Sequence, residues 1–140
     1  MQDEYWIHES SDVDYYDDTK TSGKWLVFVR AEEIDYWWET IKQLLHQGKL
    51  GKVIKSATAK ENPNARTSKQ KVIVVYSYDG RDEKDVMRIR ESLREAGITW
   101  KIPYKLELQT AFPDPEYLKV VLSSVGINMD IKKGRSIYYV

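Results

Sequence analysis

The residues best suited to chemistry lie in a basic segment between residues 48 and 71. This segment carries seven basic side chains and a single acid, Glu61. A guanidinium binds two phosphate oxygens at once and an ammonium adds a point charge, so a mixture of both with hydroxyl groups suits a phosphate. The donors that could act together are Lys60, Arg66, Lys71, Thr58, Thr67 and Ser68. The segment therefore predicts a site for a phosphate-bearing ligand.

The aromatic residues could supply a second part of such a site. The chain has five Trp and ten Tyr but only two Phe. Tyr and Trp combine a flat ring with a polar group, and rings of this kind stack on the bases of single-stranded nucleic acids. The rings that a sheet face near the basic segment could present are those of Tyr76, Tyr78, Trp100 and Tyr104.

The sequence lacks the common catalytic and metal-binding patterns. It contains no Walker loop, no Gly-x-Gly-x-x-Gly and no Gly-x-Ser-x-Gly. Cysteine is absent, which excludes disulfides and thiolate metal sites, so we expect no metal and no cofactor. His8, in the acidic N-terminal stretch, could act as a general acid or contact a phosphate. The alternative is an ordinary surface imidazole.

The formal net charge of zero conceals an uneven distribution. Residues 1–18 hold seven acids and no Lys or Arg, which leaves 15 acids against 22 bases in residues 19–140. We expect an acidic N-terminal arm, residues 1–22, packed on a single α+β domain, residues 23–140. The basic domain predicts an anionic partner, or a groove that the arm covers. A solvated arm beside an ordinary charged surface is the alternative.

The sequence predicts neither a membrane segment nor a secretory signal. No apolar run approaches the roughly 18 residues of a membrane helix. The N-terminus is acidic and polar rather than cationic and then apolar. The expected location is therefore the cytoplasm, which the lack of cysteine also fits.

The order of the apolar patterns predicts an α+β fold. Apolar residues spaced by three and four predict helices at residues 32–47, 82–96 and 114–125. Apolar or alternating runs predict strands at residues 24–30, 53–59, 71–78, 98–108, 127–131 and 136–140. Several strands follow one another directly, which favours antiparallel pairing. We expect a mainly antiparallel sheet with about three helices on one face.

Several motifs together resemble those of the basophilic-leukaemia-expressed protein (Bles) family. The likeness spans roughly residues 5–106. Its most specific parts are Ser22-Gly23-Lys24-Trp25 at the start of a strand and Ser56-Ala57-Thr58-Ala59-Lys60. Other matching pieces are Trp6-Ile7-His8, residues 37–41, Gly48-Lys49-Leu50-Gly51, Asn62-Pro63, residues 74–79 and residues 82–94. The resemblance implies the fold of the mRNA cap-binding translation initiation factor, a curved antiparallel sheet backed by helices.

This resemblance leads to a first hypothesis, that the concave sheet face binds a nucleotide or a single-stranded RNA end. The residues expected to contact phosphates are Lys24, Lys60, Arg66 and Lys105. An aromatic ring, Trp6 or Tyr76, would stack on the base.

Two other hypotheses belong to different classes. Some descriptions of the family liken it to phosphothreonine lyases, which implies removal of phosphate by β-elimination. Lys60 or Lys105 would then remove the α-proton, and His8 would protonate the leaving oxygen. The other hypothesis is a non-catalytic protein-interaction domain. The sequence leaves open whether the chain is an enzyme.

Overall fold

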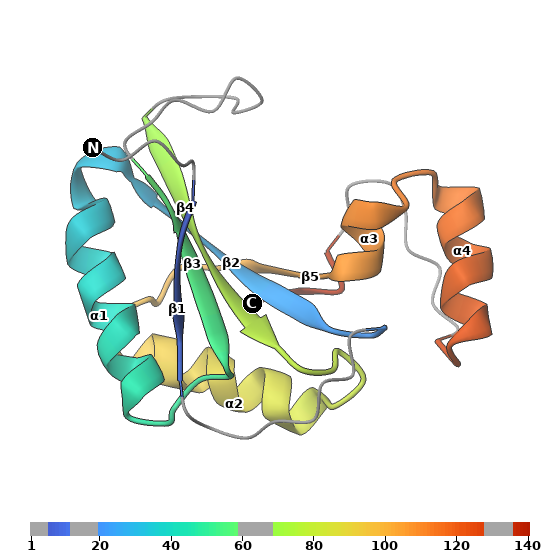
Figure 1. The fold of residues 1–140 in the computed structure, drawn as a ribbon, viewed down its shortest axis with the longest axis horizontal. Helices are drawn as coiled ribbons and strands as arrows, with labels where there is room; N and C mark the ends of the chain where they lie inside the picture. The colour runs from blue at the N-terminus through green and yellow to red at the C-terminus, as the bar shows by residue number, and fades with distance from the viewer. Residues whose placement is uncertain (1–5, 12–19, 59–68, 128–135) are drawn as a thin grey trace.

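The computed structural model describes residues 6–11, 20–58, 69–127 and 136–140. Its centre is a curved six-stranded sheet in the order β1-β3-β4-β2-β5-β6, and all neighbouring strands are antiparallel (Figure 1). The strands are β1 (Trp6–Ser10), β2 (Gly23–Arg30), β3 (Val53–Ala57), β4 (Gln70–Ser77), β5 (Pro103–Leu106) and β6 (Tyr138–Tyr139). The prediction of an α+β fold with a mainly antiparallel sheet is confirmed.

In the described ranges four α-helices accompany the sheet, one more than the sequence predicted. They are α1 (Ile34–His46), α2 (Glu83–Glu95), α3 (Glu107–Ala111) and α4 (Pro115–Ser124), and a 3-10 turn, η1 (Ala31–Glu33), precedes α1. α1 and α2 cover one face of the sheet, while α3 and α4 follow β5 on the side away from β1 (Figure 1). None of the helices in the described ranges is long and apolar enough to span a membrane.

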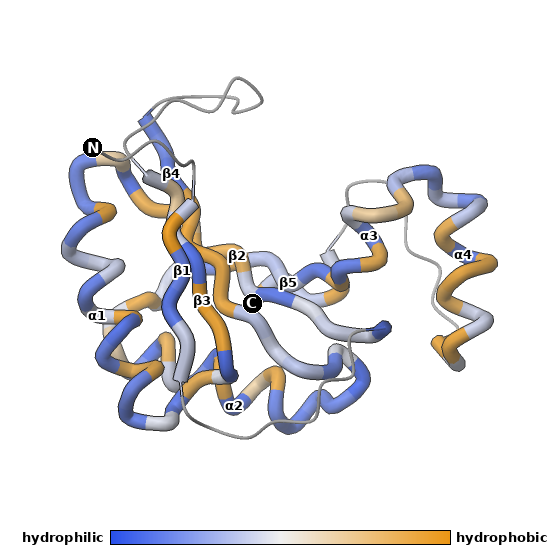
Figure 2. The backbone as a smooth tube through the Cα atoms, in the orientation of Figure 1, coloured by the Kyte–Doolittle hydropathy of each residue, from blue (hydrophilic) through white to orange (hydrophobic). Residues whose placement is uncertain are grey.

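The core lies between the sheet and the helices α1 and α2. Alternate residues of β2, namely Trp25, Val27 and Val29, are buried, and Ile73 and Val75 of β4 are buried beside them. The apolar stripes of α1 and α2 pack against this layer, as the periodicity predicted. Figure 2 shows hydrophobic stretches along the central strands β2 and β4, in keeping with this core.

The helix ends follow the capping residues that the sequence offered. Asp82 caps α2 by accepting a hydrogen bond from the Asp85 amide, and Asp114 caps α4 ahead of Pro115. Gly48 and Gly97 follow α1 and α2 with φ angles of 75° and 110°. Side chains with a Cβ rarely adopt this left-handed conformation, which explains glycine at both positions.

The long strand predicted at residues 98–108 is wrong over most of its length, because only Pro103–Leu106 forms a strand. The Arg90 guanidinium of α2 donates hydrogen bonds to the carbonyl groups of Ile98 and Trp100. These carbonyl groups are therefore not available to a neighbouring strand. At the other end, the Leu106 amide bonds to the Gln109 side chain and α3 begins at Glu107. The alternating apolar residues are buried here although they do not form a strand. Ile98 and Ile102, for example, are fully buried and lie outside β5.

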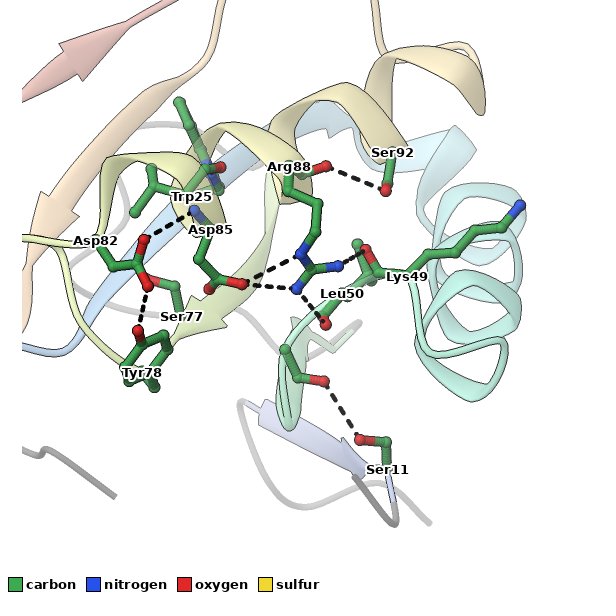
Figure 3. Close-up of polar contacts among 12 residues, drawn as sticks. Ser11, Trp25, Lys49, Leu50, Ser77, Tyr78, Asp82, Asp85, Arg88 and Ser92 are labelled. Atoms are coloured by element: carbon green, nitrogen blue, oxygen red, sulfur yellow. Dashed lines mark hydrogen bonds and ion pairs between the residues drawn. The ribbon is translucent and has the colours of Figure 1, made fainter. Parts of the chain in front are cut away.

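A polar network joins α2 to the segment that leads into β3 (Figure 3). The Arg88 guanidinium donates to the carbonyl groups of Lys49 and Leu50 at 3.0 and 3.2 Å, and forms an ion pair with Asp85 at 2.9 Å. Ser11, just after β1, donates to the Gly51 carbonyl at 3.3 Å. These bonds fix the start of β3 against α2 and the end of β1, and therefore position the side chains of β3.

Candidate functional site

The sheet face opposite α1 and α2, which we call the open face, carries most of the residues that the sequence singled out. Trp25 and Val75 point to the helices, so their neighbours Lys24 and Tyr76 point the other way. Lys24 pairs in register with Tyr76 on β4 and with Lys105 on β5. Paired residues of antiparallel strands share a face, so the three side chains form one row.

Strands β1 and β3 extend the open face to the edge of the sheet. Lys55 pairs in register with His8 on β1 and with Val74 on β4. Trp6 lies two residues before His8 and therefore shares its face. The residues that define the open face below are Trp6, His8, Lys24, Lys55, Tyr76 and Lys105.

Lys55 lies between two aromatic rings of the open face. Its Nζ is 4.3 Å from the centroid of the Trp6 ring and 5.7 Å from that of the Tyr76 ring. Both distances are within the range of a cation–π interaction, about 6 Å. Lys55 was not selected from the sequence as a ligand-binding residue. The alternation of side chains along a strand could have placed it opposite its neighbour Ile54, which is buried in the core.

Lys24 is the most buried cation of the open face, with 9% of its surface exposed. Its Nζ forms an ion pair with Glu107 Oε1 at 2.9 Å and donates a hydrogen bond to Thr110 Oγ1 at 3.2 Å. Both partners belong to α3, a helix that the sequence did not predict, so neither was selected. The Glu107 amide also donates to the Ser22 carbonyl, which holds the start of α3 beside β2.

The charges of Lys24 and Glu107 change the pKa of Tyr76. Burial raises the pKa of the Tyr76 phenol, the negative charge of Glu107 raises it further, and the positive charge of Lys24 lowers it by a smaller amount. The phenol therefore stays protonated at neutral pH and remains a hydrogen-bond donor. A donor of this kind, next to two lysines in the same row, suits a phosphate oxygen or a base edge.

Tyr104, one of the rings expected to stack on a base, belongs to the core instead. It is fully buried, packs edge-on against Trp25 with 5.2 Å between ring centroids, and shares a hydrogen bond of 2.6 Å with Ser77. Its ring closes over Gly23, where an added Cβ would lie 2.0 Å from the Tyr104 hydroxyl oxygen. The glycine of the Ser22-Gly23-Lys24-Trp25 motif thus makes room for this ring. Tyr78 lies beyond the end of β4 and donates to Asp82.

Of the residues named for the elimination hypothesis, the structure describes His8 and Lys105, and it does not bring these two together. His8 on β1 and Lys105 on β5 are four strand positions apart, roughly 19 Å at the usual strand spacing. An acid and a base on opposite sides of one phosphate would have to be much closer. Lys60 and Arg66 lie outside the described residues, so their relation to the open face stays a prediction.

A second surface feature is a hollow of about 450 Å³ near the end of β2. Trp37 and Trp100 meet there edge-on with 5.4 Å between ring centroids, and Trp100 is 37% exposed. Phe28 also lines it, together with Arg30 and other polar residues. Trp100 was among the rings considered for base stacking, but none of the residues expected to bind the ligand lines this hollow.

Residues 17–111 match the family described as "Basophilic leukemia-expressed protein Bles03". The chain belongs to this family. The matched range contains Lys24, Lys55, Tyr76 and Lys105 and ends with α3, so it also includes Glu107 and Thr110. Trp6 and His8 on β1 precede it.

The fold is similar to that of a schistosome eIF4E, a cap-binding translation initiation factor, whose crystal structure contains m7GpppA and 4E-BP. The TM-score is 0.53 and the sequence identity 15%, over 86% of this chain. The matched part spans 60% of the length of the eIF4E chain. This likeness confirms the predicted cap-binding-like fold, and at this identity it is evidence for the fold alone.

Proposed function

We propose that this protein binds a nucleotide or the end of a single-stranded RNA on the open face. The observation that carries the proposal is the alternation of rings and cations across the sheet, from Trp6 and Lys55 to Tyr76, Lys24 and Lys105. Aromatic rings stack on bases, and ammonium groups neutralise phosphates. The eIF4E of similar fold was crystallised with m7GpppA, which supports the same ligand class.

The two ends of the open face have different roles in this proposal. The base stacks on Trp6 or Tyr76, toward the β1 edge. The phosphates contact Lys24 and Lys105 on β2 and β5, where the two lysines pair in register. Lys60 and Arg66 of the basic segment add further phosphate contacts.

The two competing hypotheses, β-elimination and a protein-interaction domain, require different features of the protein. The separation of His8 from Lys105 gives no support to β-elimination with these two residues. A protein-interaction domain needs no nucleotide at all. Direct measurement of nucleotide binding therefore distinguishes that hypothesis from the proposal.

Calorimetric titration with GTP, ATP, inorganic triphosphate and a short oligoribonucleotide tests the proposal. We expect Tyr76→Leu to weaken nucleotide binding about 10-fold and triphosphate binding little, because it removes a stacking ring. Lys105→Met should weaken all four ligands. Lys119→Met, at an exposed position of α4, removes the same charge away from the open face and should change nothing.

Two results would contradict the proposal. One is an equal effect of Lys105→Met and Lys119→Met on binding. The other is a lack of binding by every ligand in the panel, which would favour the protein-interaction domain.

We also propose a cytoplasmic location and an acidic arm, residues 1–22, that packs on the domain of residues 23–140. The pairing of β1 with β3 ties residues 6–10 of this arm to the sheet. Cell fractionation tests the location. Cleavage of residues 1–22 by limited proteolysis, without loss of the melting transition, would contradict the packed arm.

A further inference from the structure

We propose that Lys55 restricts the open face to purine nucleotides with an unmodified N7, prefers guanine, and rejects N7-methylated guanine. This inference rests on the proposed function and adds the class of base. It follows from the position of the Lys55 ammonium between Trp6 and Tyr76, the two rings on which a base would stack.

The Lys55 ammonium lies near both the Trp6 ring and the Tyr76 ring. β3 lies between β1 and β4 in the sheet, so Lys55 lies between the strands that carry Trp6 and Tyr76. Its Nζ is within 4.3 Å of one ring centroid and 5.7 Å of the other. An aromatic ring attracts a cation through its negative face, and here a side chain of the protein already makes that interaction.

The chemistry of the base decides which ligand gains from this arrangement. Unmodified guanine presents two acceptors, N7 and O6, on one edge, and a lysine ammonium is a common donor to them. A guanine stacked on Trp6 or Tyr76 brings this edge within reach of Lys55. Methylation at N7 removes one acceptor and makes the base cationic. Lys55 then repels the base and loses a hydrogen bond.

The remaining cations fit the phosphates of the same ligand. Lys24 on β2 is two strand positions from Lys55, roughly 10 Å across the sheet, and Lys105 is one position further. A nucleotide with its base beside Lys55 thus extends its phosphates along the sheet toward β5. Lys55 then contacts the base, while Lys24 and Lys105 contact the phosphates. The contributions of the base and of the phosphates to affinity can therefore be measured separately.

Titration of GTP and 7-methyl-GTP into the wild type and two variants tests the proposal. The two nucleotides share their triphosphate, so their affinity ratio reports on the base alone. We expect the wild type to bind GTP about 10-fold more tightly than 7-methyl-GTP. Lys55→Met keeps the length of the side chain without its charge and should abolish this ratio, while Lys55→Arg should retain it. Lys52→Met, at an exposed position just before β3, is the matched control and should also retain it.

The possible results separate this inference from the proposed function. Equal affinity of the wild type for both nucleotides, or a ratio that Lys55→Met leaves unchanged, overturns the selectivity but not nucleotide binding. Tighter binding of 7-methyl-GTP by the wild type also overturns it. If neither GTP nor 7-methyl-GTP binds, the inference is overturned, and the titrations with ATP, triphosphate and the oligoribonucleotide decide whether the proposed function fails with it.

Discussion

Lys24 Nζ lies 2.9 Å from Glu107 Oε1 and joins β2 to the first turn of α3. The ion pair puts a carboxylate beside the row of Lys24, Tyr76 and Lys105, where the proposal puts phosphates. The Glu107 side chain is 38% exposed, whereas that of Lys24 is 11% exposed. Glu107 can therefore move into solvent more readily than Lys24 can, and under the proposed function it would compete with a phosphate for this ammonium.

Replacement of Glu107 by Gln should strengthen phosphate binding. The variant removes a negative charge next to the proposed phosphate position but keeps the size of the side chain. We expect the dissociation constant of GTP to fall about 5-fold, equivalent to about 1 kcal/mol for a partly exposed pair. Calorimetry measures this change, and Glu116→Gln at an exposed site on α4 is the control. Weaker binding by Glu107→Gln would mean that the carboxylate supports the ligand.

The pKa of Tyr76 should respond in opposite directions to loss of the two charges. Because Glu107 raises this pKa and Lys24 lowers it, Glu107→Gln should lower the pKa of Tyr76 and Lys24→Met should raise it. Titration of the Tyr76 ring resonance by NMR, assigned with Tyr76→Phe, measures both shifts. An unchanged pKa in both variants would show that the pair does not face Tyr76.

Loss of Arg90 should destabilise the fold more than any exposed arginine does. Its buried guanidinium donates to the carbonyl groups of Val140, Ile98 and Trp100 at 2.8 to 2.9 Å. Arg90→Met leaves these acceptors without their donor, so we expect the free energy of unfolding to fall by about 3 kcal/mol.

Urea denaturation of Arg90→Met and of a control, Arg94→Met, tests this expectation. Arg94 lies one turn further along α2 and pairs with Glu91 on the surface, so its loss should cost about 0.5 kcal/mol. If Arg90→Met does not fold, Arg90→Lys, which keeps part of the donor set, should fall between the two. Equal losses for both positions would contradict the role assigned to Arg90.

The hydrogen bond from Tyr78 to Asp82 should make stability depend on pH in the alkaline range. This bond, followed by burial and the charges of neighbouring acids, raises the pKa of Tyr78 to about 12. An unfolded Tyr titrates near pH 10. The bond therefore contributes fully below pH 10, and its contribution is lost as the pH rises from 10 to about 12.

Comparison of the wild type with Tyr78→Phe isolates this effect. We expect the variant to lose about 1 kcal/mol of unfolding free energy at pH 8, and the difference to shrink above pH 10. Tyr117→Phe, at a ring that is 56% exposed, should show no difference at either pH. A difference between wild type and Tyr78→Phe that stays constant up to pH 12 would exclude the raised pKa.

The sequence predicted the layered fold because its strongest patterns are local. The apolar stripes of α1 and α2, the run of β-branched residues in β4 and the cap at Asp82 each determine an element without help from distant residues. The strand prediction was wrong at residues 98–102, where the deciding partner is Arg90, a residue of another element. The charged pattern of α2 gave no sign that this arginine is buried.

The site was predictable in part for a similar reason. The hypothesis that followed the family resemblance named Lys24, Tyr76 and Lys105 together, and these three residues do pair in register on one face. Lys55 was not selected, because its place on the same face depends on the pairing of β3 with β1 and β4. Glu107 and Thr110 could not be identified from the sequence, because they contact Lys24 only when α3 forms. The alternating apolar pattern, which runs to residue 108, predicted a strand where α3 begins.

The most direct test of nucleotide binding on the open face is amide NMR mapping during titration with GTP. We expect the largest chemical-shift changes on the open face, at Lys24, Lys55, Tyr76 and Lys105. The largest changes around the hollow of Phe28, Trp37 and Trp100, or no change at saturating nucleotide, would contradict it.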